Sequence, residues 1–178
     1  MKTNIIFYAV FLFWRERGRI RILRIVLDES FESVLVCNTF MIKATFMTEL
    51  DKMLEMARKA MEQAYAPYSR FKVGAVIRSD SGRLYAGCNV ENASYPVGSC
   101  AEQGAISAMI LGGDTKIADI VVMGDGENLV SPCGACRQRI REFSTPETRV
   151  LICDRNGVRK TMTLAELLPV SFGPENLS

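Results

Sequence analysis

The most informative part of the sequence lies between residues 99 and 136, where Ser99-Cys100-Ala101-Glu102 is followed about thirty residues later by Pro132-Cys133-Gly134-Ala135-Cys136. The chain contains no histidine. Three cysteine thiolates can hold a zinc ion and leave its fourth position open to water, which is typical of a catalytic zinc site. Glu102 follows the first cysteine closely enough to transfer protons beside that water. We therefore predict that Cys100, Cys133 and Cys136 bind zinc and that Glu102 is catalytic.

Each half of this pattern also has a purely structural interpretation. Ser99 and Glu102 could form a helix capping box, and Pro132 is an ordinary residue for a first helical turn. A single C-x-x-C pair also occurs in redox sites and in structural zinc knuckles. Both halves, however, place thiols at the start of an expected helix, where the helix dipole and free N–H groups stabilise thiolates. The combination favours the zinc site, and the lack of histidine excludes Ser-His and Cys-His nucleophiles.

Composition and charge favour a small-molecule substrate. The chain has 178 residues, 48% hydrophobic and 24% charged, which is typical of one globular domain. Residues 1–47 carry seven basic and four acidic residues, and the remainder carries fifteen and sixteen. A nearly neutral body lacks the basic surface that binds a polynucleotide, so we expect no nucleic-acid partner. Six cysteines, three of them assigned to a metal, favour a reducing cytoplasm.

The first 46 residues differ in character from the rest. Residues 5–14 form an unbroken apolar run of ten residues, followed by five arginines within residues 15–24. A membrane-spanning helix needs about twenty apolar residues, and the run lacks the preceding charges and the cleavage site of a secretory signal. An interfacial anchor is one alternative. We favour a dispensable, poorly ordered leader over residues 1–46, with Met47 as the working initiator and no membrane partner.

From Met47 onward, the hydrophobic pattern alternates between helical and strand periods. It predicts a helix capped by Thr48 and ended by Pro67, a hairpin of strands 71–77 and 84–90, helices at 100–111 and 132–143, strands at 117–123, 150–153 and 158–162, and a short helix from a Thr163–Glu166 capping box to Pro169. This order predicts an α/β fold of three layers, α/β/α, with a central mixed sheet of about five strands.

The stretch from Met47 to Ser178 resembles the short, tetrameric type of cytidine deaminase along nearly its whole length. The segments that carry the resemblance, in matching order, are Ala66-Pro67-Tyr68-Ser69-Arg70-Phe71, Val73-Gly74-Ala75, Gly87-Cys88-Asn89-Val90-Glu91-Asn92-Ala93, Cys100-Ala101-Glu102, Ser131-Pro132-Cys133-Gly134-Ala135-Cys136-Arg137-Gln138, and Glu166-Leu167-Leu168-Pro169 with Phe172. Three cysteines, a nearby glutamate that is not a ligand and a P-C-x-x-C pair also form the signature of zinc nucleobase deaminases.

The resemblance implies zinc-dependent hydrolytic deamination of cytidine and deoxycytidine in pyrimidine salvage, by a cytoplasmic homotetramer with one zinc ion per chain and shared active sites. It also implies a set of substrate-binding residues: Phe71 packing on the pyrimidine, the Ala101 backbone at the base edge, Asn89 and Glu91 on the ribose hydroxyls, and Phe172 reaching a neighbouring subunit's site. From the residues alone, the two phenylalanines could equally be core residues, and Asn89 and Glu91 could be a turn pair at the hairpin's end.

One position departs from the family pattern. The residue after the catalytic glutamate is commonly arginine in this type, and here it is Gln103. Zinc bound to three thiolates carries a net charge of about −1, which weakens its Lewis acidity. The two helix N-termini and the neighbouring Arg137 can offset that charge, and Gln103 can still donate a hydrogen bond to a thiolate. We expect this departure to change fine tuning rather than the reaction.

Four other functions fit the sequence less well than a nucleoside deaminase does. A deaminase of a cytosine-bearing antibiotic or modified nucleoside shares the P-C-x-x-C-R-Q motif, but Asn89-Val90-Glu91 suits a free ribose. A polynucleotide deaminase is disfavoured by the charge distribution. A non-catalytic zinc module would need a fourth protein ligand, which is not evident near the motifs. A thiol oxidoreductase would need neither Glu102 nor zinc.

Overall fold

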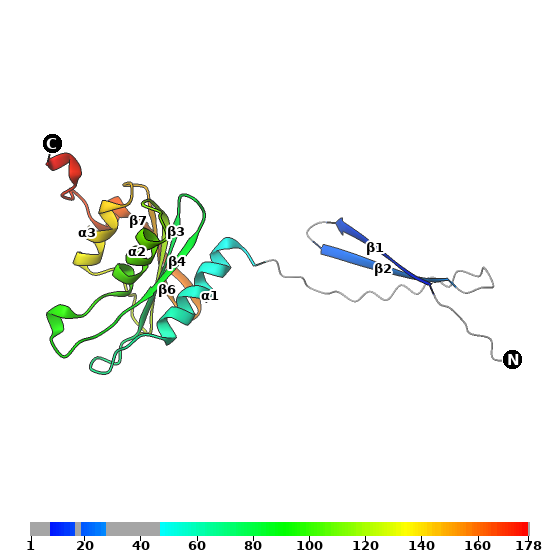
Figure 1. Ribbon diagram of the computed structural model, residues 1–178, viewed down its shortest axis with the longest axis horizontal. Helices are drawn as coiled ribbons and strands as arrows, with labels where there is room; N and C mark the ends of the chain where they lie inside the picture. Colours follow the sequence, from blue (N-terminus) through cyan, green and yellow to red (C-terminus); the bar gives the residue numbers. More distant parts are fainter. Residues whose placement is uncertain (1–7, 17–18, 28–46, 178) are drawn as a thin grey trace. The chain divides into compact units, whose positions relative to one another are not determined.

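The computed structural model describes residues 8–16, 19–27 and 47–177. The chain divides into two compact units, Met1–Phe46 and Met47–Ser178. In the first unit, β1 (Tyr8–Glu16) and β2 (Arg19–Leu27) form an antiparallel pair (Figure 1). The expectation that residues 1–46 are poorly ordered and dispensable falls largely outside the described residues, and it stays a prediction.

The second unit contains one five-stranded sheet. Its strands, in spatial order, are β4 (Leu84–Cys88), β3 (Val73–Ser79), β5 (Ile117–Gly124), β6 (Arg149–Asp154) and β7 (Gly157–Thr163). Strands β5 and β6 pair in parallel, and every other neighbouring pair is antiparallel. The predicted mixed sheet of about five strands is therefore confirmed.

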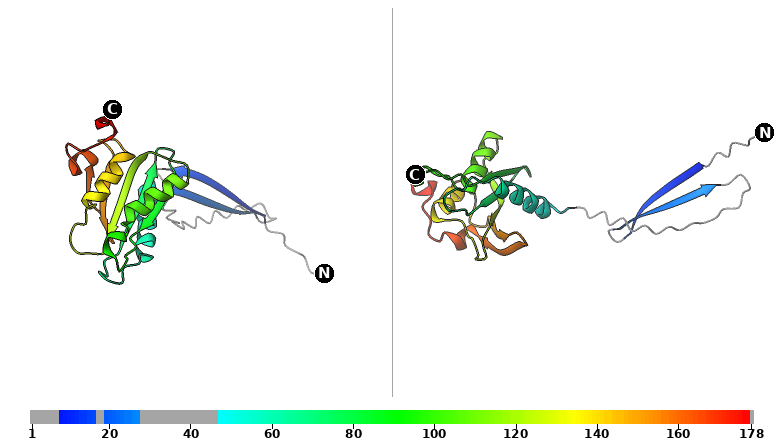
Figure 2. Two further views of the ribbon diagram at one scale, coloured as in Figure 1. Left: turned by 60° about the vertical axis from the view of Figure 1, so that its left-hand side comes forward. Right: turned by 90° about the horizontal axis from the view of Figure 1, so that it is seen from below.

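Helices cover both faces of this sheet and complete the three predicted layers (Figures 1 and 2). On one face lies α1 (Glu49–Glu62); on the other lie α2 (Ala101–Leu111), α3 (Gly134–Glu142) and α4 (Leu164–Leu167). Short 3₁₀ helices occupy Tyr95–Val97 and Pro174–Asn176. No helix in the described part of the chain is long and apolar enough to cross a membrane.

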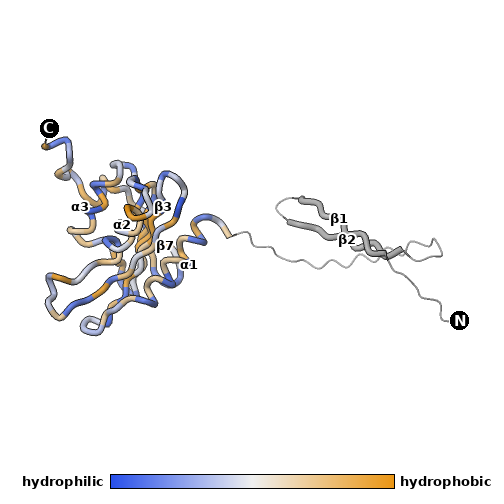
Figure 3. The backbone as a smooth tube through the Cα atoms, in the orientation of Figure 1, coloured by the Kyte–Doolittle hydropathy of each residue, from blue (hydrophilic) through white to orange (hydrophobic). Residues whose placement is uncertain are grey.

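The core follows from the alternation of side chains along the buried strands. In β5, Val121 packs with Met53 and Met61 of α1, whereas Ile120 and Val122 pack on the opposite side with α2, α3 and α4. Hydrophobic residues are accordingly concentrated in the central strands (Figure 3). Burial on both faces explains why β5 reads as a nearly continuous apolar run in the sequence.

Helix α1 begins as predicted and ends earlier than predicted. Thr48 is its N-cap, and a capping box with Asp51 satisfies two free N–H groups. The helix ends at Glu62 rather than at Pro67. The reason is the backbone of Tyr65, which donates to the Asn89 carbonyl and accepts from the Glu91 N–H. These bonds pair Tyr65 with the segment that follows β4, so the backbone has already left the helical conformation two residues before Pro67.

Candidate active site

Two cysteines start the two helices of the site. Cys100 is the N-cap of α2 and Cys133 is the N-cap of α3, both with extended backbones. The capping-box alternative is wrong, because Ser99 precedes the N-cap and both its backbone groups pair with Val90. The helix expected from Pro132 likewise begins two residues later, at Gly134.

The three predicted zinc ligands come together. The sulfur atoms of Cys100, Cys133 and Cys136 all lie within 4.8 Å of one another, and those of Cys100 and Cys133 are 4.0 Å apart. Ligands at about 2.3 Å in a tetrahedral arrangement would place two sulfurs about 3.8 Å apart. The separation is about twice the length of a disulfide bond, and all three cysteines are free thiols. The arrangement therefore fits three ligands of one zinc ion.

Electrostatics at the cluster also suit a cation. Burial raises the pKa of the Cys136 thiol, and the charge of the Glu102 carboxylate and its hydrogen bond to that thiol raise the pKa further. Burial opposes ionisation of Cys133 too, but the Cys136 N–H and the neighbouring thiols outweigh it and lower the pKa of Cys133. This N–H belongs to the first turn of α3, so the expected stabilisation of thiolate at a helix start is present at Cys133. The same expectation is wrong for Cys100 at the start of α2, because burial raises the pKa of that thiol. A divalent cation would offset the negative charge that gathers here.

Glu102 is buried beside these thiols. It occupies the second position of α2, and only 4% of its surface is exposed. Among the described residues no basic side chain pairs with Glu102, and a buried carboxylate without such a partner is costly, which argues against a merely structural residue at this position. Ala101, the residue before it, is fully buried at the first position of the helix.

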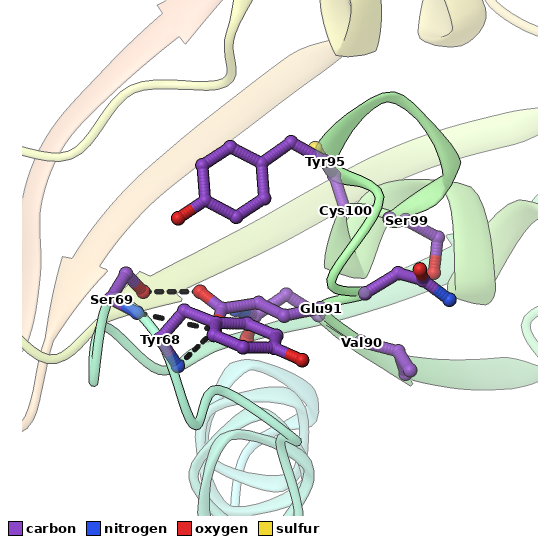
Figure 4. A pocket seen from close by; sticks show the side chains of 10 residues that line it. Tyr68, Ser69, Val90, Glu91, Tyr95, Ser99 and Cys100 are labelled. Carbon is purple, nitrogen blue, oxygen red and sulfur yellow. Dashed lines mark hydrogen bonds between the residues drawn. The ribbon is translucent and has the colours of Figure 1, made fainter.

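A cavity of about 430 Å³ opens next to Cys100 (Figure 4). Its lining residues come from the turn before β3, the segment after β4 and the segment before α2: Tyr68, Ser69, Asn89, Val90, Glu91, Asn92, Tyr95, Gly98, Ser99 and Cys100. The structure thus brings the proposed ribose-binding pair and one zinc ligand into one cavity. The volume lies within the range of small-molecule sites.

Asn89 and Glu91 both hold the turn that precedes β3. Asn89 Oδ1 accepts from the Val73 N–H at 2.8 Å, and its Nδ2 donates to the Phe71 carbonyl at 2.9 Å. Glu91 Oε2 accepts from the Tyr68 N–H at 2.9 Å. The Asn89 side chain thus bonds the Val73 N–H and the Phe71 carbonyl in place of the backbone of a neighbouring strand. This explains why β3 begins at Val73 and not at the predicted residue 71.

The other expected substrate residues lie outside the lining of this cavity. Phe71 is half-buried, and its ring packs so closely over Gly126 that a Cβ there would lie 3.0 Å from Phe71 Cε2. Phe172 is 58% exposed, and its carbonyl accepts from Gln138 Nε2 at 3.0 Å. An exposed phenylalanine near the C-terminus of a single chain is not a core residue, so that alternative is wrong for Phe172.

Arg137 and Gln103 differ in how they are held. Arg137 donates to the Pro132 carbonyl at 2.7 Å, the Leu167 carbonyl at 2.9 Å and Ser131 Oγ at 3.0 Å. These neutral acceptors fix a positive charge beside the loop that leads to Cys133. Gln103 is half-buried in the first turn of α2.

The cluster and the cavity beside it are typical of a zinc-binding enzyme that acts on a small molecule. The family described as the cytidine and deoxycytidylate deaminase zinc-binding region matches residues 47–152. A cytidine deaminase of Sporosarcina psychrophila is 41% identical over 130 residues, which cover 73% of this chain and 96% of that protein. One from Halalkalibacterium halodurans is 38% identical, with 71% and 96% covered.

A solved structure gives the same result. The crystal structure of a cytidine deaminase from Burkholderia pseudomallei has a TM-score of 0.65 and 40% identity to this chain, with 68% of this chain and 97% of that chain covered. The chain belongs to the cytidine and deoxycytidylate deaminase family, and it is a zinc-binding deaminase.

Proposed function

We propose that this chain hydrolyses cytidine and deoxycytidine to uridine and deoxyuridine, releasing ammonia, as a step of pyrimidine salvage. The observation that carries this proposal is the cavity that Asn89 and Glu91 line together with Cys100 of the zinc-ligand cluster. A free nucleoside needs both a site for its base near the metal and polar partners for its sugar. The names of the relatives support the same substrate.

The chain's own residues account for the proton transfers. Zinc held by Cys100, Cys133 and Cys136 would supply the Lewis acidity that makes water reactive at neutral pH. The Glu102 carboxylate takes a proton from the attacking water and delivers it to N3 of the ring, which makes C4 electrophilic. After the water oxygen has bonded to C4, Glu102 takes the proton of the new C4 hydroxyl and passes it to the amine, so that the C4–N4 bond breaks, the C4 carbonyl forms and ammonia leaves. One carboxylate acts as base and then as acid.

The side chains assigned to the sugar keep hydrogen-bond donors and acceptors that their contacts within the described residues do not use. Asn89 uses one of its two amide donors and one of its two acceptor sites within the chain, so one of each remains for a ribose hydroxyl. A hydrogen bond from Ser69 lowers the pKa of Glu91, so this carboxylate is ionised and can accept from a second hydroxyl. We assign the pyrimidine to the Phe71 ring and the base edge to the Ala101 backbone.

We further propose a cytoplasmic homotetramer whose sites are completed across subunits. The exposed Phe172 side chain supports this assembly, and so does Tyr95, which lines the cavity and is 77% exposed. Aromatic residues that a monomer leaves exposed in this way are enriched at subunit contacts. The free thiols at the metal cluster support a reducing compartment.

The test is turnover of cytidine by the purified, zinc-loaded protein, followed as ammonia and uridine produced in equal amounts. We expect activity on cytidine and deoxycytidine and little on free cytosine, which lacks the sugar that Asn89 and Glu91 bind. Zinc-loaded, folded protein that releases no ammonia from either nucleoside would refute the proposed function.

A further inference from the structure

The turn at residues 66–70 has an unusual backbone. Arg70 has a φ of 58°, in the left-handed region that residues other than glycine rarely adopt. Its N–H donates to the Ala66 carbonyl at 3.1 Å. Such conformations persist only where surrounding contacts enforce them, and they gather at binding sites. Phe71, which we assign to the pyrimidine, follows directly, so whatever enforces this turn also places that ring.

One hydroxyl lies at the centre of the contacts that hold this turn. Ser69 Oγ accepts from the Phe71 N–H at 3.0 Å. It also bonds Glu91 Oε1, and because a carboxylate can only accept, Ser69 is the donor there. Both directions are therefore fixed: the hydroxyl accepts from the backbone of Phe71 and donates to the side chain of Glu91. Figure 4 shows the Ser69 side chain directed toward Glu91 across the turn.

We propose that Ser69 is a positioning residue that sets the sugar-binding carboxylate of Glu91 and the base-packing ring of Phe71 in one fixed relation. This inference rests on the proposed function. Ser69 lines the same cavity as Glu91 and Asn89. Both backbone polar groups of Phe71 are hydrogen-bonded to side chains: its N–H donates to Ser69 Oγ, and its carbonyl accepts from Asn89 Nδ2.

The remaining contacts show why the hydroxyl can be removed without unfolding the turn. Glu91 Oε2 still accepts from the N–H groups of Tyr68 and Ser69, at 2.9 and 3.2 Å, in the absence of the hydroxyl. What is lost is the bond that fixes Oε1 and the partner of the Phe71 N–H. The turn is expected to persist with a less ordered carboxylate and ring.

The experiment compares Ser69→Ala with Ser69→Thr in the zinc-loaded full-length protein. For Ser69→Ala we expect the KM for cytidine to rise at least tenfold and kcat to fall less than threefold, because Glu102 and the thiols lie on α2 and α3 and not on this turn. Ser69→Thr keeps the hydroxyl and should restore most of the affinity. The matched control is Ser144→Ala. Ser144 lies beyond the end of α3, and its hydroxyl donates to the Ile140 carbonyl within that helix.

A second substrate distinguishes the effect of Ser69 on the Glu91 carboxylate from its effect on the Phe71 ring. The nucleoside 2′,3′-dideoxycytidine lacks the 2′ and 3′ hydroxyls, which we take as the partners of Glu91, and keeps only the 5′ hydroxyl. The rise in KM caused by Ser69→Ala should therefore be several-fold smaller with it than with cytidine. The rise that remains measures the placement of Phe71. A purely structural role would weaken both substrates equally.

Two results have distinct meanings. If the parent protein turns over cytidine and Ser69→Ala has the same KM, or loses only kcat, the positioning role is overturned and the proposed function stands. If the zinc-loaded parent protein does not act on cytidine, the proposed function fails and this inference fails with it. Should Ser69→Ala not accumulate, Ser69→Cys replaces it, because a thiol is a much weaker donor and acceptor of the same size class.

Discussion

Gly87 of β4 controls the position of the catalytic helix, and Gly87→Ala is expected to damage the site by displacing the backbone of α2, Ala101 included, without removing any functional side chain. A Cβ at Gly87 would lie 2.7 Å from the Gly104 carbonyl carbon, and closer still to the Ala101 oxygen and the Ala105 nitrogen. Ordinary contact begins at 3.4 Å, and all three obstructing atoms are backbone of α2. The start of α2, which carries Glu102, must therefore move by about 1 Å.

A displacement of this size lowers both the stability of the fold and the rate of the reaction. Overpacking of a filled interface costs about 1–3 kcal/mol, which in a domain of this size lowers the melting temperature by about 3–12 °C. A misplacement of about 1 Å at a catalytic group costs about 100-fold in rate. We therefore expect Gly87→Ala to fold, to melt lower and to lose about two orders of magnitude in kcat/KM for cytidine.

The assay combines calorimetry, zinc content and cytidine turnover, with Gly134→Ala as the matched control. Gly134 begins α3 directly after a zinc ligand, but a Cβ there meets no atom within 4 Å. The same added methyl group should therefore leave zinc content and melting temperature unchanged. If Gly87→Ala kept the parent rate and stability, the contact between β4 and α2 would not position the site.

Four further predictions concern the site and the leader. Glu102→Gln should keep zinc and bind cytidine normally while kcat falls by about three orders of magnitude or more, because only proton transfer is removed; a near-parental rate would exclude the catalytic role. The lowered pKa of Glu91 means that its bonds to the turn stabilise the folded protein above the ordinary carboxyl range and are lost as pH falls through the lowered value, so the KM for cytidine should stay constant down to the ordinary glutamate value of about 4.3 and rise only below it, and at a higher pH in Ser69→Ala; a rise that begins at neutral pH would contradict this. Mixing inactive Glu102→Gln chains with inactive Phe172→Ala chains should restore part of the activity in hybrid tetramers, and verified hybrids without activity would count against shared sites. Deleting residues 1–46 should preserve zinc binding and turnover, measured against the full chain, and loss of either would make the leader part of the domain.

The sequence predicted the elements and the metal ligands well for identifiable physical reasons. Helical spacing predicts the buried side of α1, where Met53 lies, and the nearly continuous apolar run at residues 117–123 predicts a strand that is buried on both faces. Cys100 and Cys133 were expected at helix starts, and each is an N-cap. The boundaries were less accurate, since the helix expected to reach Pro67 is ended instead by the pairing of Tyr65 with a distant segment.

The arrangement of the cavity could not be read from sequence in the same way. The resemblance pointed to Asn89 and Glu91 as sugar ligands, but nothing local showed that both also hold the turn before β3. Ser69 lies 22 residues before Glu91, and a bond across that separation leaves no periodic or spacing signal. The matching segment at residues 66–71 marked this stretch as part of the family pattern, yet it did not assign the hydroxyl a role.

The most direct test of the central claim is a parallel measurement of zinc and deaminase activity in the protein and in Cys136→Ala. Cys136 is fully buried in the cluster of three thiols, so its removal leaves two ligands. We predict one zinc ion per chain and cytidine turnover in the parent protein, and loss of both together in the variant. Full deaminase activity in protein that contains no metal, or in Cys136→Ala, would contradict the assignment of this cluster as the catalytic zinc site.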